Sequence, residues 1–385
     1  MQQPISITAI HSISALGSSP KKVWEQYLND QCQIKNKTIG SVTALMAALA
    51  KDDRKEIEGL RLSNDAYKDL DDSVLYAIYV SRKVVSIAGW DKSSSFGVNI
   101  GSSRGATALF EKYYQSFLEK STSETLSSPT TTLGNISSWV AQDLKSKGPD
   151  ISHSITCSTG LHALLNGVAW LQSGMADQFL IGASEAALTD FTIAQMQALR
   201  VYAKRNIEYP CKALDLHKNH NTMVLGEAAA SICLEKEISE KTIAIINGVG
   251  YATESISHNA SISAEATCFQ DAMKMAIKDK EISEIDIVIT HTPGTIKGDI
   301  AEIKAIEKVF DKNKPAITTN KWKLGHTFAT SGLLSLELAV LMLQHQEFIS
   351  VPYLKEQDKP KQIRNIIVNA VGFGGNAVSV LISSP

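Results

Sequence analysis

Cys157 has the sequence setting that best suits covalent chemistry. It lies in SITCSTGLHALLNGVAW, between residues 151–156, which suit a short strand, and residues 160–173, whose apolar residues recur at helical spacing. A cysteine directly before a helix faces unpaired backbone N–H groups and the positive end of the helix dipole, which favour the thiolate. We therefore expect Cys157 to be a nucleophile. Free cysteines are more often small core residues, the role that we assign to Cys32, Cys211, Cys233 and Cys268.

Two histidines form the second group of candidate residues. His291 begins the segment HTPGTIKGD, and His326 lies in KWKLGHTFATSG, so each follows a predicted strand end or lies at a glycine-rich turn. Two imidazole N–H groups that converge on one carbonyl oxygen would stabilise negative charge that develops on that oxygen. This chemistry requires the two segments to fold together. The other seven histidines are expected to be structural or exposed.

The segment NAVGFGG, residues 369–375, is rich in glycine. Its glycines, Gly372, Gly374 and Gly375, let the backbone approach a substrate without a Cβ clash and also permit positive φ. A tight turn between two strands would need the same freedom. We interpret the segment as part of the geometry of an active site.

The elements that must position these residues alternate between strand and helix. After a strand within residues 5–17, the first half is expected to contain helices at 22–28, 74–88 and 160–173, strands at 96–100 and 179–181, a polar surface excursion at 51–72 and a loop at 121–132. The second half is expected to contain strands at 243–251, 285–289 and 365–369 and helices at 261–277, 300–310 and 332–343. This order predicts an α/β protein with largely parallel sheets and two halves, residues 1–238 and 239–385.

Composition excludes several classes of function. The chain of 385 residues is 44% hydrophobic and has 38 basic and 40 acidic residues, without a polybasic tail, so neither nucleic acid nor a membrane surface is an expected partner. The five cysteines include no CxxC pair, so we expect neither a disulfide framework nor a metal site. No stretch reaches the roughly 20 apolar residues of a membrane span, and no signal peptide is visible. We expect a cytoplasmic protein.

Four segments, in this order, resemble the motifs of β-ketoacyl-ACP synthases of the thiolase superfamily. TCSTG at 156–160, with Gly148-Pro149 before it and Gly174, Asp177, Gly182 and Glu185 after it, resembles the nucleophile region. HTPGTIKGD with Glu302 is similar to HGTGTxxGDxxE, and KWKLGHTFATSG is similar to KSxxGHxxGAxG. NAVGFGG resembles NSFGFGG. The Cys-His-His set resembles elongating enzymes of the type I and II kind, since initiating synthases have Asn in place of His326 and biosynthetic thiolases have a second catalytic cysteine.

The resemblance implies a thiolase-like, five-layered α-β-α-β-α sandwich of two pseudo-symmetric halves. It also implies decarboxylative Claisen condensation of an acyl-enzyme thioester with malonyl-ACP, in fatty-acid or polyene/polyketide chain elongation. The implied catalytic residues are Cys157, His291, His326, Lys321 and Glu302, with Lys321 and Glu302 in an ion-paired network around the histidines. The implied oxyanion hole consists of the N–H groups of Cys157 and Phe373, and the implied substrate contacts are Thr295, Phe373 and Gly374.

The sequence departs from the family pattern around the expected substrate entrance. Thr292-Pro293 stands where many members have Gly-Thr, and Val371 stands where Phe is common. The segment CKALDLHKNHNTMVLGEAAA is two residues longer than its family counterpart and has Thr222 in place of a glycine. Chain length and pathway, whether fatty-acid, polyene or polyketide, therefore stay open.

The resemblance also implies the partners. No bound cofactor is expected, because the phosphopantetheine arm arrives on acyl carrier protein, for which Lys204, Arg205 and Lys323 are candidate docking residues. The family implies a homodimer, or a heterodimer with a related subunit. The alternatives to a condensing enzyme are a non-condensing scaffold subunit of such a heterodimer and an uncoupled thioester hydrolase or decarboxylase.

Overall fold

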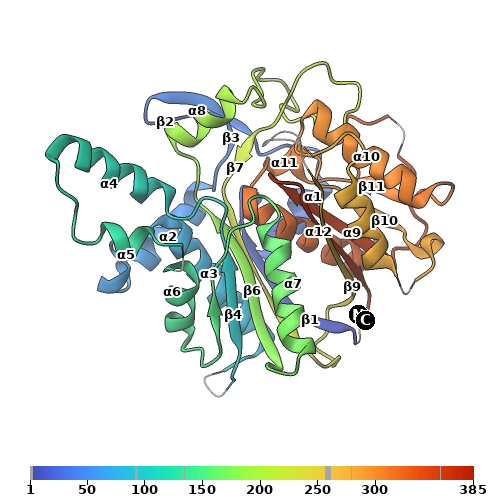
Figure 1. Cartoon of the computed structure of the whole chain (residues 1–385), viewed down its shortest axis with the longest axis horizontal. Helices are drawn as coiled ribbons and strands as arrows, with labels where there is room; N and C mark the ends of the chain where they lie inside the picture. The colour runs from blue at the N-terminus through green and yellow to red at the C-terminus, as the bar shows by residue number, and fades with distance from the viewer. Residues whose placement is uncertain (1–2, 92–93, 134, 256–261, 279, 356) are drawn as a thin grey trace.

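A computed structural model of the chain describes residues 3–91, 94–133, 135–255, 262–278, 280–355 and 357–385 (Figure 1). Within these residues, one large mixed sheet contains ten strands. In spatial order, the first half contributes β5 (Asp150–Ile151), β4 (Gly97–Gly101), β6 (Gln178–Glu185), β8 (Ala228–Glu235) and β1 (Ile5–Ile13). The second half continues with β9 (Ala244–Thr253), β13 (Asn376–Ser383), β12 (Asn365–Gly372), β10 (Ile287–Ile289) and β11 (Ala316–Thr318).

Both halves have the same strand pattern. In the first half, β1, β8 and β6 are antiparallel neighbours, and β6, β4 and β5 are parallel neighbours. The second half repeats this pattern with β9, β13 and β12, then β12, β10 and β11, and an antiparallel pair of β1 with β9 joins the halves. The prediction of largely parallel sheets is therefore wrong. The short turn after Gly372 can connect β12 to β13 only as antiparallel strands.

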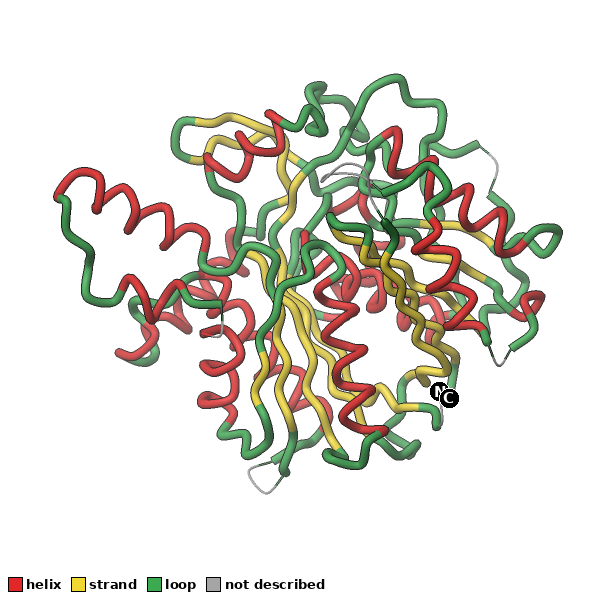
Figure 2. The backbone as a smooth tube through the Cα atoms, in the orientation of Figure 1, coloured by secondary structure: helices red, strands yellow, loops and turns green. Residues whose placement is uncertain are grey.

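The two halves of the sheet form two layers of the molecule, and helices form the other three (Figures 1 and 2). The middle layer consists of α7 (Thr159–Gln172) and α12 (Ser331–His345), which pack against each other and against β6 and β12. The outer layers consist of α3 (Asp72–Ala88) and α6 (Asn135–Leu144) over the first half, and α9 (Thr267–Ile277) and α10 (Ile296–Phe310) over the second. This arrangement is the predicted α-β-α-β-α sandwich.

Strands covered on both faces bury apolar residues on both. In β6, Ile181 packs with the middle helices and Leu180 packs in the cluster beneath α3. In β12, Val368 faces the middle layer and Ile367 lies in the cluster of α9 and α10. Strands of this kind read as continuous apolar runs, which is why sequence located them.

The middle helix α12 is apolar on every side. The segment Phe328–His345 is long and apolar enough to span a membrane by length and composition alone, but 89% of it is buried inside the molecule. A helix that is packed on all sides in a protein core has the same composition. Burial in the core therefore accounts for the apolar composition of this segment.

The remaining helices and strands surround the sandwich. They are α1 (Pro20–Leu28), β2 (Lys35–Ile39), β3 (Val42–Ala47), α2 (Lys51–Leu62), α4 (Thr107–Lys120), α5 (Ser127–Thr131), α8 (Asp190–Ala198), β7 (Leu225–Gly226), α11 (Lys321–Leu324) and 3-10 helices at Asp65–Tyr67, Ile282–Glu284 and Phe328–Thr330. The helices α4 and α5 form an arm that extends from the body (Figures 1 and 2).

Two segments predicted as irregular contain helix. The polar excursion at 51–72 is mostly α2, which lies at the surface but buries Ile57 and Leu60 on its inner face. The loop at 121–132 contains the short helix α5. Charged and Ser/Thr-rich composition hid both helices, because few of their residues face the core.

Some predicted bounds also move. The strand at 151–156 is only the two-residue β5, because the chain then turns toward Cys157. The second-half helix expected from residue 300 begins earlier, at Ile296, with Thr295 as its N-cap. The helix expected from residue 261 begins at Thr267, and residue 261 itself lies outside the described residues.

Candidate active site

Cys157 lies at the turn that leads from β5 into α7. Thr156, the residue before it, has φ 46°, an outlying conformation for a β-branched residue. The hydroxyls of Ser103 and Thr159 each donate a hydrogen bond of 2.6 Å to the Thr156 carbonyl oxygen. Strained backbone held by several surrounding bonds is typical of functional turns. The turn fixes the cysteine at the edge of the middle layer.

Two glycines let the nucleophile turn and the His326 turn approach closely. A Cβ atom on Gly160, in the first turn of α7, would lie 2.5 Å from the Ala329 carbonyl oxygen. A Cβ on Gly332, in α12, would lie 2.7 Å from Leu161 Cγ. Real Cβ atoms do not come this close, so only glycine allows these contacts. The middle helices thereby bring the two catalytic motifs together.

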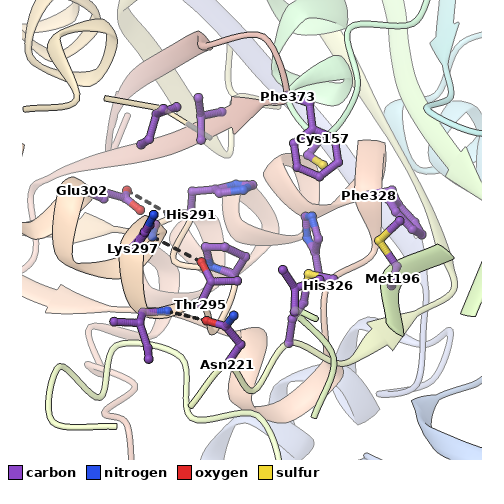
Figure 3. A pocket seen from close by; sticks show the side chains of 18 of the residues that line it. Cys157, Met196, Asn221, His291, Thr295, Lys297, Glu302, His326, Phe328 and Phe373 are labelled. Carbon is purple, nitrogen blue, oxygen red and sulfur yellow. Dashed lines mark hydrogen bonds between the residues drawn. The ribbon is translucent and has the colours of Figure 1, made fainter. Parts of the chain in front are cut away.

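His291 and His326 lie against each other beside one cavity (Figure 3). Their ring centroids are 5.3 Å apart and the rings are perpendicular. Nδ1 of His326 lies 2.9 Å from Oγ of Ser331, which already accepts the Thr327 N–H. The serine hydroxyl can therefore donate to Nδ1, which leaves the proton of the neutral imidazole on Nε2.

Both histidines are uncharged at neutral pH. Burial, and to a smaller extent the charge of Lys321, lower the pKa of His326 to about 3. Burial, Lys321 and His326 together hold the pKa of His291 well below its ordinary value. A neutral imidazole still donates one N–H. The pair therefore suits hydrogen bonding to an anionic oxygen rather than storage of a positive charge.

Glu302 holds the backbone of the first histidine motif. Its Oε1 accepts the N–H of His291 at 2.9 Å, and its Oε2 accepts the N–H of Thr292 at 2.7 Å. The Asn369 side-chain amide, from the glycine-rich motif, donates to Oε1 at 3.2 Å. Burial raises the pKa of Glu302 to about 7 against the effect of these bonds. Glu302 thus fixes His291 by orienting its backbone.

Lys321 is buried and is not among the residues that line the cavity. Burial lowers the pKa of Lys321 to about 8, while Glu302 and Cys211 raise it. Among the described residues, no ion pair within 4.0 Å joins Lys321 to Glu302, so the expected ion-paired network takes another form. Lys321 acts on the site through its charge, which lowers the pKa of both histidines and of Cys157.

The resting cysteine is a thiol, contrary to the prediction of a thiolate. Burial, together with the charge of Glu185, raises the pKa of Cys157 to about 12, and the charge of Lys321 opposes this rise. Helix α7 begins only at Thr159, so the effect of its N-terminus does not outweigh burial. Deprotonation must therefore accompany the reaction with a substrate.

A cavity of about 370 Å³ joins most of the predicted site residues. It is lined by Cys157, His291, His326, Glu302, Thr295 and Phe373. Thr295 lies on the α10 side and Phe373 beside Cys157 (Figure 3). Of the predicted contacts, Gly374 is not among the lining residues, and its place is taken by Gly372.

Sequence reasoning missed the apolar wall of this cavity. That wall consists of Met196, Val201, Met223, Ile262, Phe269 and Phe328, with the noted substitution Val371 beside them. Phe328 lies within the His326 motif and has φ 47°, which a sequence does not reveal. The others come from α8, α9 and loops, and no motif marks them. Such a wall is suited to an apolar chain.

The segment around residue 222, which departs from the family pattern, supports the loop after His291. Thr222 donates its N–H and its hydroxyl to the Gly294 carbonyl oxygen, at 2.8 and 2.9 Å. Asn221 lines the cavity, and its Oδ1 accepts the N–H of Ile296 at 2.9 Å (Figure 3). The substitution of a glycine by Thr222 therefore adds hydrogen bonds at the cavity entrance.

The prediction that Lys323 helps to dock a carrier protein is wrong. Lys323 is fully buried, and its Nζ donates to the carbonyl oxygens of Gln26, Asn29 and Gln31, just past the end of α1. A cation at a helix C-terminus satisfies the last carbonyls and the helix dipole. Lys204 and Arg205 are exposed and stay candidates.

Family models match most of the chain. The model described as Beta-ketoacyl synthase, N-terminal domain, matches residues 2–239, and the model described as Beta-ketoacyl synthase, C-terminal domain, matches residues 243–353. A 3-oxoacyl-[acyl-carrier-protein] synthase 2 of Coxiella burnetii is 25% identical over 406 residues, which cover 98% of each chain. The chloroplastic 3-oxoacyl-[acyl-carrier-protein] synthase I of Arabidopsis thaliana is 25% identical over 346 residues, covering 82% of this chain and 72% of its own.

Solved structures share the fold over the whole chain. The ishigamide ketosynthase/chain length factor has a TM-score of 0.85 at 17% identity, covering 100% of this chain and 99% of that one. A β-ketoacyl synthase from Burkholderia phymatum has a TM-score of 0.83 at 20% identity, with 100% of both chains covered. These likenesses confirm the predicted thiolase-like fold.

Proposed function

Because the chain belongs to the β-ketoacyl synthase family, we propose that it condenses an acyl group held on Cys157 with malonyl-ACP to give β-ketoacyl-ACP. This is one elongation step of a fatty acid, polyene or polyketide. The observation that carries the proposal is that Cys157, His291 and His326 line one cavity with an apolar wall.

The first half-reaction transfers the acyl group to the enzyme. The Cys157 sulfur attacks the thioester carbonyl of acyl-ACP, a new C–S bond forms, and the bond to the pantetheine sulfur breaks. The thiol proton leaves with the pantetheine thiol. The backbone N–H groups of Cys157 and Phe373 are the proposed donors to the oxyanion. The turn at Gly374 and Gly375, with φ of 100° and 71°, supports this role because it presents the backbone at the cavity.

The second half-reaction forms the carbon–carbon bond. The malonyl C–COO⁻ bond breaks, CO₂ leaves, and the electron pair passes into an enolate whose oxygen accepts N–H from His291 and His326. The enolate carbon attacks the acyl carbonyl, the bond to Cys157 breaks, and the thiolate that is released takes a proton from water. Neutral histidines support this role, because they donate hydrogen bonds without protonating the carbanion.

Glu302 and Lys321 are the proposed supporting residues. Glu302 orients His291, and Lys321 supplies the positive charge that favours both the Cys157 thiolate and the enolate. Thr295 is the proposed contact of the phosphopantetheine arm, because it lines the cavity and carries a hydroxyl group, whose oxygen also caps α10. Gly374, with φ 100°, is proposed to turn the chain directly after Phe373.

Acyl carrier protein is the proposed partner and carries the phosphopantetheine arm, and no bound cofactor is proposed. One structural neighbour is a type II PKS acyl-carrier protein in complex with its ketosynthase, at a TM-score of 0.84 and 17% identity. We also propose a cytoplasmic location and a boundary between the halves at residues 238 and 239, between the end of β8 and the start of β9.

A homodimer is the proposed assembly. The exposed apolar side chains of α4 support it, since Phe110, Tyr114, Phe117 and Leu118 form one face of a projecting helix. Phe110→Asp with Leu118→Asp should give a monomer by light scattering. Met175→Asp, at an isolated exposed methionine, is the control that should leave the dimer intact.

The second candidate is a scaffold subunit that needs a related partner to condense. The altered entrance around Thr222 motivates it, while the complete Cys-His-His set favours an enzyme active by itself. A heterodimer would be needed only in the scaffold case. Free acid or acetyl thioester as sole product would indicate the uncoupled hydrolase or decarboxylase.

The decisive experiment is intact-protein mass spectrometry after mixing with a panel of acyl-ACP donors, followed by malonyl-ACP and product analysis. Acylation at Cys157 and a β-ketoacyl product two carbons longer are expected. Cys157→Ala should remove the acyl adduct, and Cys233→Ala, in the core of β8, should not. No acylation of the folded protein by any donor would contradict the proposal.

A further inference from the structure

Glu185 connects the turn of the nucleophile with the turn of the second histidine. It is the last residue of β6, and its Oε1 accepts the backbone N–H groups of Ser103 and of Ala329, the latter at 3.3 Å. The Ser103 hydroxyl in turn donates to the carbonyl oxygen of Thr156, beside Cys157. Ala329 lies three residues after His326. One carboxylate oxygen therefore touches both halves of the site.

Both of the connected turns contain a strained residue. Thr156 and Phe328 have φ of 46° and 47°, and neither is glycine. Such residues persist only where the surrounding structure holds them. The bond to the Ala329 N–H, directly after Phe328, and the link through Ser103 to Thr156 supply part of that hold.

The other oxygen of Glu185 is in an unfavourable setting. Glu185 is fully buried, and its Oε2 makes no hydrogen bond of standard geometry among the described residues, although the nearby Ser102 and Ser103 hydroxyls lower its pKa in part. Burial raises the pKa of Glu185 to about 7. A buried acid with an unpaired oxygen lowers stability, so its presence is better explained by the site than by the fold.

Glu185 also acts on the nucleophile through its charge. The charged groups that act on Cys157 are Glu185, which raises its pKa, and Lys321, which lowers it, while burial is the largest cause. His291 and His326 share the cavity but are neutral at neutral pH. Removing the negative charge of Glu185 must therefore lower the pKa of Cys157.

We propose that Glu185 is a positioning residue whose Oε1 holds the Cys157 turn and the His326 turn in one arrangement. Its consequence for condensation rests on the proposed function. The coupling of the two turns does not, because it is a property of the folded chain and is measured without any substrate.

Hydrogen exchange read by mass spectrometry tests the coupling. Glu185→Ala should make amide exchange roughly tenfold faster or more in peptides from both turns, residues 155–161 and 325–332. Glu185→Gln should keep exchange slow, because its carbonyl oxygen still accepts both N–H groups. Glu337→Ala is the matched control, since Glu337 is also buried but accepts only from Ser12, at 2.8 Å, and it should change neither peptide. Exchange that rises in one peptide alone, or in neither, would overturn the proposal.

Alkylation of Cys157 by iodoacetamide, followed by peptide mass spectrometry across pH, tests the charge. Glu185→Gln should move the midpoint to lower pH by on the order of one unit, and Glu337→Gln should not move it. An unmoved midpoint in Glu185→Gln would refute the effect on the thiol. If Glu185→Ala does not fold, Ser103→Ala replaces it and should speed amide exchange in the 155–161 peptide only. Exchange in Ser103→Ala that equals the exchange in wild type would count against the link between Glu185 and the Cys157 turn.

Discussion

Gly372 lies so close to Thr156 that a Cβ atom at residue 372 would come within 2.0 Å of the Thr156 Oγ1 atom. The glycine-rich turn of the second half therefore rests directly on the nucleophile turn of the first. Rotation of the Thr156 side chain would not make enough room, because the same Cβ atom would also lie 2.8 Å from the backbone carbonyl oxygen of Ile155. At this junction the backbone of Gly372 packs against the Thr156 hydroxyl and the Ile155 carbonyl oxygen, beside the cavity that Gly372 lines.

Gly372→Ala should consequently displace the nucleophile turn. We expect at least roughly 100-fold slower acylation of Cys157, because a misplaced nucleophile loses its alignment with the carbonyl, and a moderate loss of stability from overpacking. Gly59→Ala, in α2 with no atom within 4 Å of the added Cβ, is the control and should acylate normally. Acylation of Gly372→Ala at the wild-type rate would show that the turns can separate without effect.

The sequence pointed to candidate site residues because the chemistry proposed for them depends on residue type. Cys157, His291 and His326 each lie in a short motif, and the alternation of strands and helices predicted two similar halves that could bring them together. Five of the predicted lining residues besides Cys157 do line the cavity. Buried strands such as β6 and β12 were found for a related reason, since apolar runs are a local property.

What could not be predicted depends on contacts between distant segments. The thiol of Cys157 was expected to favour the thiolate, but it is buried in a cluster with Phe328 and other residues from distant segments, and burial raises its pKa. Lys323 looked like an exposed lysine, and only the packing of α1 beside α11 buries it. The role of Asn221 at the entrance likewise follows from a loop 75 residues away. Local sequence carries no signal for such pairings.

Glu302 should matter more for the histidine step than for acyl transfer. Glu302→Ala removes the acceptor for the N–H groups of His291 and Thr292, so decarboxylation of malonyl-ACP should fall roughly 100-fold, while self-acylation falls less. Measuring both rates separates the effects. Glu307→Ala, on the exposed face of α10, should change neither rate. Equal losses in both rates would indicate general disruption of the site instead.

The buried ion pair of Lys218 and Asp299 should be a large contributor to folding. Its Nζ–Oδ2 distance is 2.7 Å, and Asp299 also accepts the N–H groups of Gly294 and Leu214. Lys218→Met leaves the buried carboxylate unpaired, so denaturant unfolding should show a loss of about 3–5 kcal/mol. Adding Asp299→Asn should restore much of it.

The exposed pair of Lys308 and Glu265 provides the comparison, and Lys308→Met should leave stability nearly unchanged. If Lys218→Met and Lys308→Met unfold at the same denaturant concentration, the buried pair contributes no more to stability than the exposed pair.

Lys321 should speed self-acylation of Cys157 and lower the stability of the folded chain. Its charge lowers the pKa of Cys157, so Lys321→Met should raise that pKa further and slow self-acylation at least roughly tenfold.

Burial lowers the pKa of Lys321 itself from 10.5 to about 8, so folding is penalised while the lysine is charged. Between these two values the unfolded chain holds the proton and the folded chain does not, so wild-type stability rises with pH relative to the variant. Lys321→Met should therefore be more stable than wild type at pH 7, and the difference should shrink toward pH 10. Denaturant unfolding across this range, with the exposed Lys314→Met as control, measures it, and a constant difference would mean that Lys321 is not the titrating group.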